Sequence, residues 1–251
     1  MMSMMKKALI VSKLKKAWLP LLICTVLLSA CQTEKNIPLD YVSYGRDLFR
    51  IDARAYEKCS VYEETAQKYA ALVGEVAEAL KGETRVYCLI IPTAYGIMIT
   101  EDMQAMLPDY TDTKSCISEV YAALPESAEP ISVWDRLKEN SDDYIYFRTD
   151  QHWTARGAYL GYEAFCEQKG IVPIPLDAHC TESFAGFLGS FYYEVGCDEK
   201  LLPEEIVEAF YPISDGVELT VTDEKGNTEV RPMVADVSEL SPSAKYQTFA
   251  G

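Results

Sequence analysis

The chain has 251 residues and is strongly acidic, because 39 Asp and Glu residues outweigh 23 Lys and Arg residues and give a formal net charge of −16. Such a surface repels phosphate polymers and anionic lipid headgroups, which excludes nucleic acid as an expected partner, although acidity also serves simply to keep a protein soluble. The length is enough to bury a substantial core, and it fits one large domain or one domain with an elaborate insertion.

The first 30 residues are arranged like a signal peptide. Five lysines and no acid lie within residues 1–16, and an apolar run follows over residues 17–28. This run is shorter than the roughly 20 residues of a membrane-spanning helix, which is the alternative interpretation. It ends at Leu28-Ser29-Ala30-Cys31, a context in which the cysteine is lipidated and becomes the first mature residue. We therefore predict a lipoprotein signal peptide over residues 1–30.

The predicted mature protein begins with a lipid on Cys31 and a polar tether over residues 31–40. Loss of the five leader lysines would leave 18 basic residues against 39 acidic ones, a net charge of −21. Contact with the membrane should therefore come from the lipid and not from a basic patch. This predicts that the folded part, residues 41–251, lies on the outer face of the cell membrane.

Six cysteines follow Cys31, an even number that permits three disulfides outside the cell. They are Cys59, Cys88, Cys116, Cys166, Cys180 and Cys197. We predict a bond between Cys180 and Cys197, because both lie in an irregular, Gly-rich stretch where a cross-link is most useful. Cys88 and Cys166 lie on apolar patterns and are expected to be buried thiols. With no Cys-x-x-Cys spacing and only two histidines, a structural zinc site is not expected.

A helix followed by a buried strand indicates α/β architecture. Between Arg54 and Lys81, apolar residues recur at steps of three and four, which predicts an amphipathic helix that Gly82 ends. The stripe consists of Tyr62, Ala66, Tyr69, Val73, Val76 and Leu80. Residues 85–91 then form an apolar run that Pro92 stops, which is typical of a strand covered on both faces.

The most polar motif of the chain follows directly on a predicted strand. The patterns before it predict a helix over 117–124, a strand over 131–133, a helical turn over 135–139 and a strand over 144–147. The motif is Arg148-Thr149-Asp150-Gln151-His152-Trp153-Thr154, and a helix over 155–169, closed by Gly170, is expected after it. In open α/β sheets, ligands and catalytic groups gather at this edge.

Residues 171–240 have a different character, with prolines, a stretch rich in glycine and aromatic residues, and apolar residues that alternate around Lys225-Gly226-Asn227. This pattern predicts a β-rich insertion with one hairpin. The segment 244–251 has no helix cap and no charged tail, so we expect the chain to stop within a domain.

Asp150 and His152 carry the chemistry that the sequence suggests. A carboxylate beside an imidazole can fix its tautomer and stabilise the imidazolium that forms when the ring accepts a proton. The structural alternative is a turn in which Asp150 caps the helix and His152 packs against Trp153. A metal-dependent hydrolase that uses Asp150, His152 and His179 is a weaker alternative, because His179 has no spacing that ties it to the others.

The segment from Tyr146 to Thr154, with Gly157-Ala158-Tyr159 after it, resembles the signature of the DHHW protein family of Gram-positive bacteria. It is also similar to the Thr-Asp-x-His-Trp-Thr segment of the alginate O-acetyltransferases, which belong to the wider SGNH hydrolase-like group. Supporting features are Ile91-Pro92-Thr93, the segment from Phe187 to Tyr192, and Lys245-Tyr246. The resemblance covers about residues 40 to 251.

The resemblance implies a flavodoxin-like α/β sandwich of three layers, incomplete in this chain. It implies that Asp150 is the orienting acid and His152 the base of a Ser-His-Asp triad. Their neighbours Arg148, Thr149, Trp153 and Thr154 are then expected to contact substrate or to support these two residues. No cofactor is implied.

Two positions depart from the family pattern. Gln151 replaces the first histidine of the motif that names the family, a position that is not catalytic in the alginate enzymes. The nucleophilic serine of these proteins follows in a later Asp-Ser segment, which does not occur before Gly251, and Ser190, Ser214 and Ser243 match nothing in the pattern. We therefore expect a truncated reading frame that is inactive as it stands.

Two functions are consistent with these features. The first is an extracytoplasmic O-acyl esterase or O-acetyltransferase that acts on a hydroxyl of a cell-envelope polysaccharide. The second is a lipoprotein that binds a glycan or a protein without chemistry, since 17 tyrosines suit sugar stacking and interface contacts. An Asp-Ser segment encoded downstream would favour the enzyme.

Overall fold

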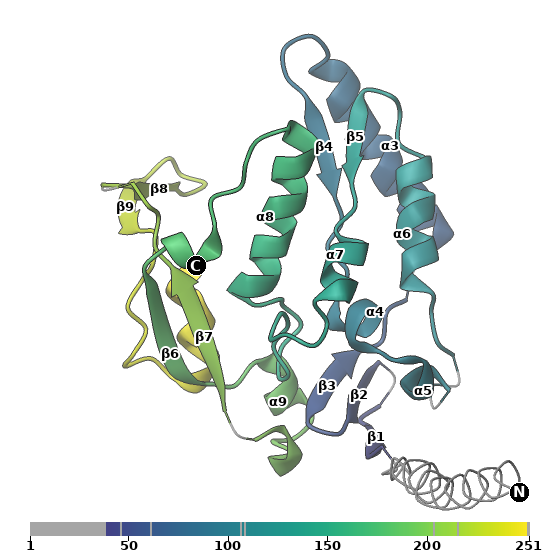
Figure 1. The fold of residues 1–251 in the computed structure, drawn as a ribbon, viewed down its shortest axis with the longest axis vertical. Helices are drawn as coiled ribbons and strands as arrows, with labels where there is room; N and C mark the ends of the chain where they lie inside the picture. Colours follow the sequence, from purple (N-terminus) through teal and green to yellow (C-terminus); the bar gives the residue numbers. More distant parts are fainter. Residues whose placement is uncertain are drawn as a thin grey trace, which may run out of the picture. The chain divides into compact units, whose positions relative to one another are not determined.

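The computed structural model describes residues 39–45, 47–60, 62–105, 107, 109–202, 204–214 and 216–249. The predicted signal peptide, Cys31 and most of the predicted tether lie outside these residues. Within the described part, no helix combines the length and the apolar character that crossing a membrane requires. The elements form a mixed α/β fold (Figure 1), as the sequence predicts.

A small antiparallel sheet opens the folded part. Its strands are β1 (Tyr41–Ser43), β2 (Leu48–Ile51) and β3 (Arg54–Glu57), in that order. The prediction that a helix begins at Arg54 is therefore wrong, and α3 spans Glu63–Ala79. Phe49 and Tyr56 are partners in the β2–β3 register, and their rings stack 5.4 Å apart. Such cross-strand aromatic pairs stabilise the strand conformation at these positions.

The buried face of α3 differs from the predicted stripe. Its buried residues are Ala70, Gly74 and Ala77, whereas Tyr62, Tyr69 and Val76 are exposed. A Cβ on Gly74 would lie 3.0 Å from the ring of Pro125, so small residues let α3 pack closely at this point. Close packing of the helix at this point requires small side chains, and hydrophobic periodicity alone does not predict that requirement.

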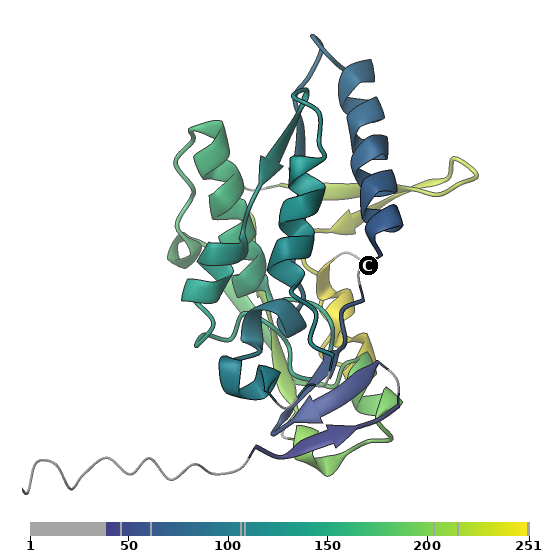
Figure 2. The same ribbon diagram turned by 90° about the vertical axis from the view of Figure 1, so that its right-hand side faces the viewer.

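A pair of parallel strands forms the central layer. The predicted strand over 85–91 is confirmed as β4 (Val86–Leu89), and it pairs with β5 (Ala128–Ile131), three residues before the predicted strand over 131–133. The helices of this half are α4 (Ala94–Met98), α5 (Glu101–Gln104), α6 (Thr113–Ala122), α7 (Trp134–Glu139) and α8 (Ala155–Lys169). Helices α3 and α6 lie on one side of this pair and α8 on the other (Figures 1 and 2).

The C-terminal half is rich in short strands. Its elements are η1 (Leu176–Ala178), β6 (Thr181–Phe187), α9 (Ser190–Glu194), η2 (Glu199–Leu201), β7 (Glu205–Phe210), β8 (Glu218–Thr222), β9 (Thr228–Pro232) and η3 (Pro242–Phe249). Strands β6 and β7 pair antiparallel, and β8 and β9 form the predicted hairpin. Among the described residues the sheets have only two or three strands each.

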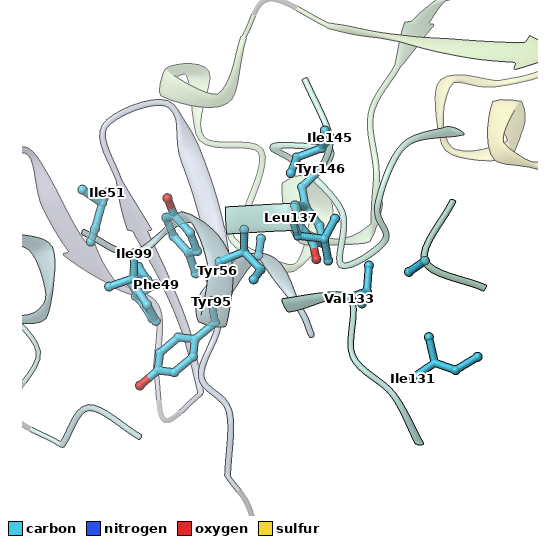
Figure 3. Close-up of a cluster of buried hydrophobic side chains, with 13 residues drawn as sticks. Phe49, Ile51, Tyr56, Tyr95, Ile99, Ile131, Val133, Leu137, Ile145 and Tyr146 are labelled. Carbon is cyan, nitrogen blue, oxygen red and sulfur yellow. The ribbon is translucent and has the colours of Figure 1, made fainter. Parts of the chain in front are cut away.

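Two hydrophobic clusters meet at the segment before the polar motif. The first, drawn in Figure 3, contains Tyr146 together with Phe49, Leu137 and Ile131. The second contains Phe147 with residues of β6 and β7, including Phe187 and Val207. Because consecutive side chains enter different clusters, the backbone that leads into the motif is held from both sides.

Candidate active site

The chain reverses direction in a turn formed by residues 144–154, here called the polar turn. The predicted strand over 144–147 is not formed, because its backbone bonds to the other half of the turn. Phe147 N–H donates to the His152 carbonyl oxygen at 3.3 Å, and Thr154 N–H donates to the Ile145 carbonyl oxygen at 2.9 Å. A single antiparallel bridge joins Tyr146 to Trp153.

Thr154 connects the polar turn to α8. Its hydroxyl donates to the Tyr144 carbonyl oxygen at 2.7 Å and accepts from Gly157 N–H at 3.3 Å as the N-cap of the helix. The expectation that Asp150 caps this helix, part of the structural alternative, is therefore wrong. The predicted end of α8 is confirmed, because Gly170 adopts the left-handed conformation with φ of 67°.

Asp150 and His152 are joined as the sequence suggests. Asp150 Oδ1 lies 2.5 Å from His152 Nδ1 and also accepts from the backbone N–H of His152 at 3.0 Å. In a neutral imidazole that faces a carboxylate in this way, the proton lies on Nδ1 and the lone pair on Nε2. The His152 side chain is 44% exposed, whereas that of Asp150 is 11% exposed, so the base is accessible and its partner is sheltered.

His152 stacks on Tyr246 and not on Trp153. The two ring centroids lie 4.6 Å apart with an interplanar angle of 23°. Burial, followed by the charge of Asp150, raises the pKa of Tyr246, so its hydroxyl stays protonated at neutral pH. The sequence marked Lys245-Tyr246 only as a supporting feature, and the 94 positions between the two rings explain why their contact was missed.

Trp153 is positioned by two glycines of α8. A Cβ on Gly161 would lie 2.8 Å from the Trp153 ring, and a Cβ on Gly157 would lie 2.3 Å from the Ile145 carbonyl oxygen. These close approaches hold the start of α8 against the polar turn. Trp153 therefore contributes packing on one side and faces a pocket on the other.

The segment around Gly189 packs behind Asp150. The second carboxylate oxygen of Asp150 accepts from Ser190 N–H at 3.2 Å, and Phe191 N–H donates to the Thr149 carbonyl oxygen at 3.0 Å. Gly189 N–H donates to the Thr149 hydroxyl at 2.9 Å. Both oxygens of the Asp150 carboxylate are thus fixed, one by the histidine and one by the start of α9.

Glu205 is a site residue that sequence reasoning missed. Its side chain is fully buried, and it accepts from the backbone of Arg148 and Thr149 and from the Thr149 hydroxyl. It lies on the same buried face of β7 as Val207 and Ala209. The sequence of this strand, Glu-Ile-Val-Glu-Ala-Phe, has apolar residues on both faces and therefore gives no signal of the buried carboxylate. Burial, followed by the charge of Glu205, raises the pKa of Tyr144, whose hydroxyl donates to it at 2.7 Å.

Arg148 does not reach the Asp150–His152 pair. Its Nε lies 3.4 Å from Glu205 Oε2, and its guanidinium lies 5.8 Å from the centroid of the Tyr144 ring. Thr149, in contrast, is completely buried behind Asp150. Of the four neighbours named from the sequence, Thr149 and Thr154 therefore support the polar turn, Trp153 lines a pocket, and Arg148 pairs with Glu205.

A large pocket of about 860 Å³ lies next to the polar turn. Its walls include Trp153, Thr154, Tyr159, Tyr162, His179, Phe210, Tyr246 and Phe249. Tyr246 is the shared wall, because one of its faces stacks on His152. Aromatic lining of this kind is common in ligand sites.

The weaker alternative of a metal site with His179 and the predicted bond between Cys180 and Cys197 both differ from the described structure. His179 bonds through Nδ1 to the Tyr211 carbonyl oxygen at 2.8 Å, and within the described ranges no group of three or more His, Cys, Asp or Glu side chains could hold a metal ion. Cys180 and Cys197 are exposed free thiols, so the predicted bond between them is not formed.

The separation of Cys180 from Cys197 has a structural reason. Cys180 precedes β6, whose seven residues extend for about 23 Å, and Cys197 follows α9, which packs against β3. Cys88 and Cys166 are buried, as predicted. Among the residues that the structure describes, the hydrogen-bond partner of the His152 ring is Asp150, and no serine hydroxyl is bonded to it.

Comparison with known proteins identifies the family and related folds. A model described as DHHW protein matches residues 42–251. A DHHW family protein from Eubacterium siraeum has a similar structure, with a TM-score of 0.72 and 22% identity over 84% of this chain and 70% of that one. PatB1 of Bacillus cereus aligns with a TM-score of 0.60 and 17% identity over 84% of this chain and 72% of that one.

The O-acetyltransferase domain of Pseudomonas putida AlgJ is matched at 13% identity over 84% of this chain and 77% of that one, with a TM-score of 0.45. None of the curated proteins matches this chain. The family match covers the polar turn, the strands that surround it and the segment of Tyr246. The chain therefore belongs to the DHHW family.

Proposed function

We propose that this protein is an extracytoplasmic O-acyl esterase or O-acetyltransferase of the SGNH type, acting on a hydroxyl of a cell-envelope polysaccharide. The observation that carries the proposal is the 2.5 Å contact between Asp150 Oδ1 and His152 Nδ1, with a half-exposed imidazole. The family membership and the likeness to PatB1 support it. A flavodoxin-like sandwich of three layers, completed by strands not present among the small sheets described, is part of this proposal.

In the proposed reaction, His152 Nε2 removes the proton of a serine hydroxyl as the serine oxygen attacks the ester carbonyl carbon. Asp150 stabilises the imidazolium that results. The imidazolium then gives its proton to the departing alcohol oxygen, which leaves an acyl-serine. Water or a glycan hydroxyl next attacks the acyl carbon while Nε2 takes its proton. The imidazolium returns a proton to the serine oxygen as its bond to the acyl carbon breaks, which frees the serine and the carboxylic acid or the glycan ester.

We further propose that the serine comes from an Asp-Ser segment encoded beyond codon 251, so that residues 1–251 alone are inactive. Extension of the gene sequence past this codon tests the point directly. The extended protein, expressed without its leader, is then assayed for hydrolysis of a chromogenic acetyl ester. We expect activity that His152→Ala lowers about a million-fold, to a rate still above that in buffer. A stop codon at position 252, or a rate of ester hydrolysis that His152→Ala leaves unchanged, would contradict the enzyme proposal.

The location is also a proposal, which rests on the leader pattern before Cys31. A lipid on this cysteine would hold the acidic protein at the outer face of the cell membrane, where envelope polysaccharide is accessible. In cells that express the full precursor, Cys31→Ala is expected to abolish incorporation of labelled palmitate and to block processing at residue 30. Incorporation that is equal in the variant and in the unmodified protein would contradict the assignment.

The second candidate function is binding of a glycan or a protein without chemistry. The specific observation in its favour is the pocket of about 860 Å³ with aromatic walls. Binding of envelope polysaccharide by this pocket would be insensitive to His152→Ala but would be weakened by Tyr159→Ala. Ester hydrolysis that depends on His152 would support the enzyme and contradict a function in binding alone.

A further inference from the structure

We propose that Glu205 is a positioning residue for the Asp150–His152 pair, which it reaches through Thr149 and Gly189. This inference rests on the role proposed above for the pair. The orientation of the His152 imidazole would then be set by a carboxylate 53 positions away in the chain, at the first residue of β7. Glu205 would touch neither substrate nor the reacting atoms.

The Glu205 carboxylate is an acceptor for four short hydrogen bonds from the polar turn. Oε1 accepts from Thr149 N–H at 2.8 Å and from the Thr149 hydroxyl at 2.5 Å. Oε2 accepts from Arg148 N–H at 2.7 Å and from the Tyr144 hydroxyl at 2.7 Å. A buried carboxylate is tolerated only with such partners, so these bonds fix the backbone of residues 148 and 149.

The contact continues from Thr149 to Asp150. Because the Thr149 hydroxyl donates its hydrogen to Glu205, its lone pair accepts from Gly189 N–H at 2.9 Å. This bond holds Gly189 so close that an added Cβ would lie 2.4 Å from the Asp150 Cβ. The next residue, Ser190, donates its N–H to Asp150 Oδ2. The hydrogen-bond series thus runs from Glu205 to the carboxylate oxygen that does not contact His152.

An amide cannot replace the carboxylate. In Glu205→Gln, one oxygen becomes an NH2 group, which would face either Arg148 N–H or Thr149 N–H, so two donors would oppose each other. A buried backbone N–H without an acceptor is costly, and the turn is expected to shift to avoid it. Glu208 offers a matched control on the same strand, because it is paired with Arg156 at the surface and bonds to no residue of the site.

A merely structural role for Glu205 would lower stability without changing the imidazole of the folded protein. The tautomer of His152 distinguishes the two cases, because only a correctly placed Asp150 holds the proton on Nδ1. The chain has just two histidines, so 15N-histidine labelling gives signals that His152→Ala assigns directly. The measurement needs no substrate.

The experiment compares the full chain with its Glu205→Gln, Glu208→Gln, Thr149→Val and Thr149→Ser variants, by 15N shifts of the His152 ring and by the Nδ1 proton signal. We expect the Nδ1–H tautomer in the unmodified protein, in Glu208→Gln and in Thr149→Ser. We expect its loss, with a shift towards the Nε2–H tautomer, in Glu205→Gln and in Thr149→Val.

A folded Glu205→Gln protein with unchanged ring signals would overturn the inference. If Glu205→Gln does not fold, the two Thr149 variants decide, and equal signals in both would overturn it. A lack of ester hydrolysis by the extended, unmodified protein would contradict the proposed function. The 15N signals of the His152 ring would still test the positioning role of Glu205. The two failures are therefore distinguishable.

Discussion

Replacement of Asp150 by asparagine is expected to lower the rate of acetyl ester hydrolysis about ten-thousand-fold in the protein that carries the serine, while the fold stays intact. An asparagine fits the same space and keeps an oxygen for Ser190 N–H or for His152 N–H. Its NH2 group can face His152 Nδ1, which then must accept, so the proton moves to Nε2 and the base is lost. The assay is the initial rate with a chromogenic acetyl ester at saturating and at low concentration.

The size of this effect separates catalysis from damage to the fold. Asp142→Asn is the matched control, because Asp142 is exposed and precedes the polar turn. It should keep the full rate and unfold at the urea concentration of the unmodified protein, since surface changes cost within about 0.5 kcal/mol. The urea curve of Asp150→Asn, a buried position, shows that this variant is folded under the conditions of the assay. An Asp150→Asn protein that hydrolyses the ester at the unmodified rate would show that the contact with His152 has no catalytic role.

The parts of the site that sequence reasoning found are those encoded locally. Asp150 and His152 are two positions apart, and the helix predicted after them ends at Gly170, so each relation falls within a single turn or helix. The hairpin of β8 and β9 is likewise specified by alternation and a Lys-Gly-Asn turn. Relations of this kind can be predicted from the sequence, because residues close together in the chain determine the local backbone geometry.

The missed parts depend on contacts between distant segments. Tyr246 reaches His152, and Glu205 reaches Thr149, only after β6, β7 and η3 have folded against the polar turn. The strand predicted over residues 144–147 failed for a local reason, because Ile145 and Phe147 bond to the other half of the same turn. Propensity favoured a strand, but the short-range bonds of the turn decided the outcome.

Substitution of Gly189 by alanine is expected to destabilise the protein by about 1–3 kcal/mol and to lower the hydrolytic rate about 100-fold. The φ of Gly189 is −76°, which any residue adopts, so backbone freedom is not what the position requires. The requirement is space, because an added Cβ would lie 2.4 Å from the Asp150 Cβ and 2.5 Å from the Thr149 carbonyl oxygen. Neither atom is the end of a flexible side chain, so Asp150 itself has to move.

Ser190→Ala is the matched control for this prediction, because the Ser190 side chain is exposed and only its backbone N–H contacts Asp150. Urea denaturation measures stability, and the rate with the acetyl ester measures the geometry of the pair. A Gly189→Ala protein that is as stable and as active as Ser190→Ala would mean that α9 can move away without consequence, and that Asp150 is not held by this segment. Loss of rate in Ser190→Ala as well would instead give its hydroxyl a role that its position in the fold does not suggest.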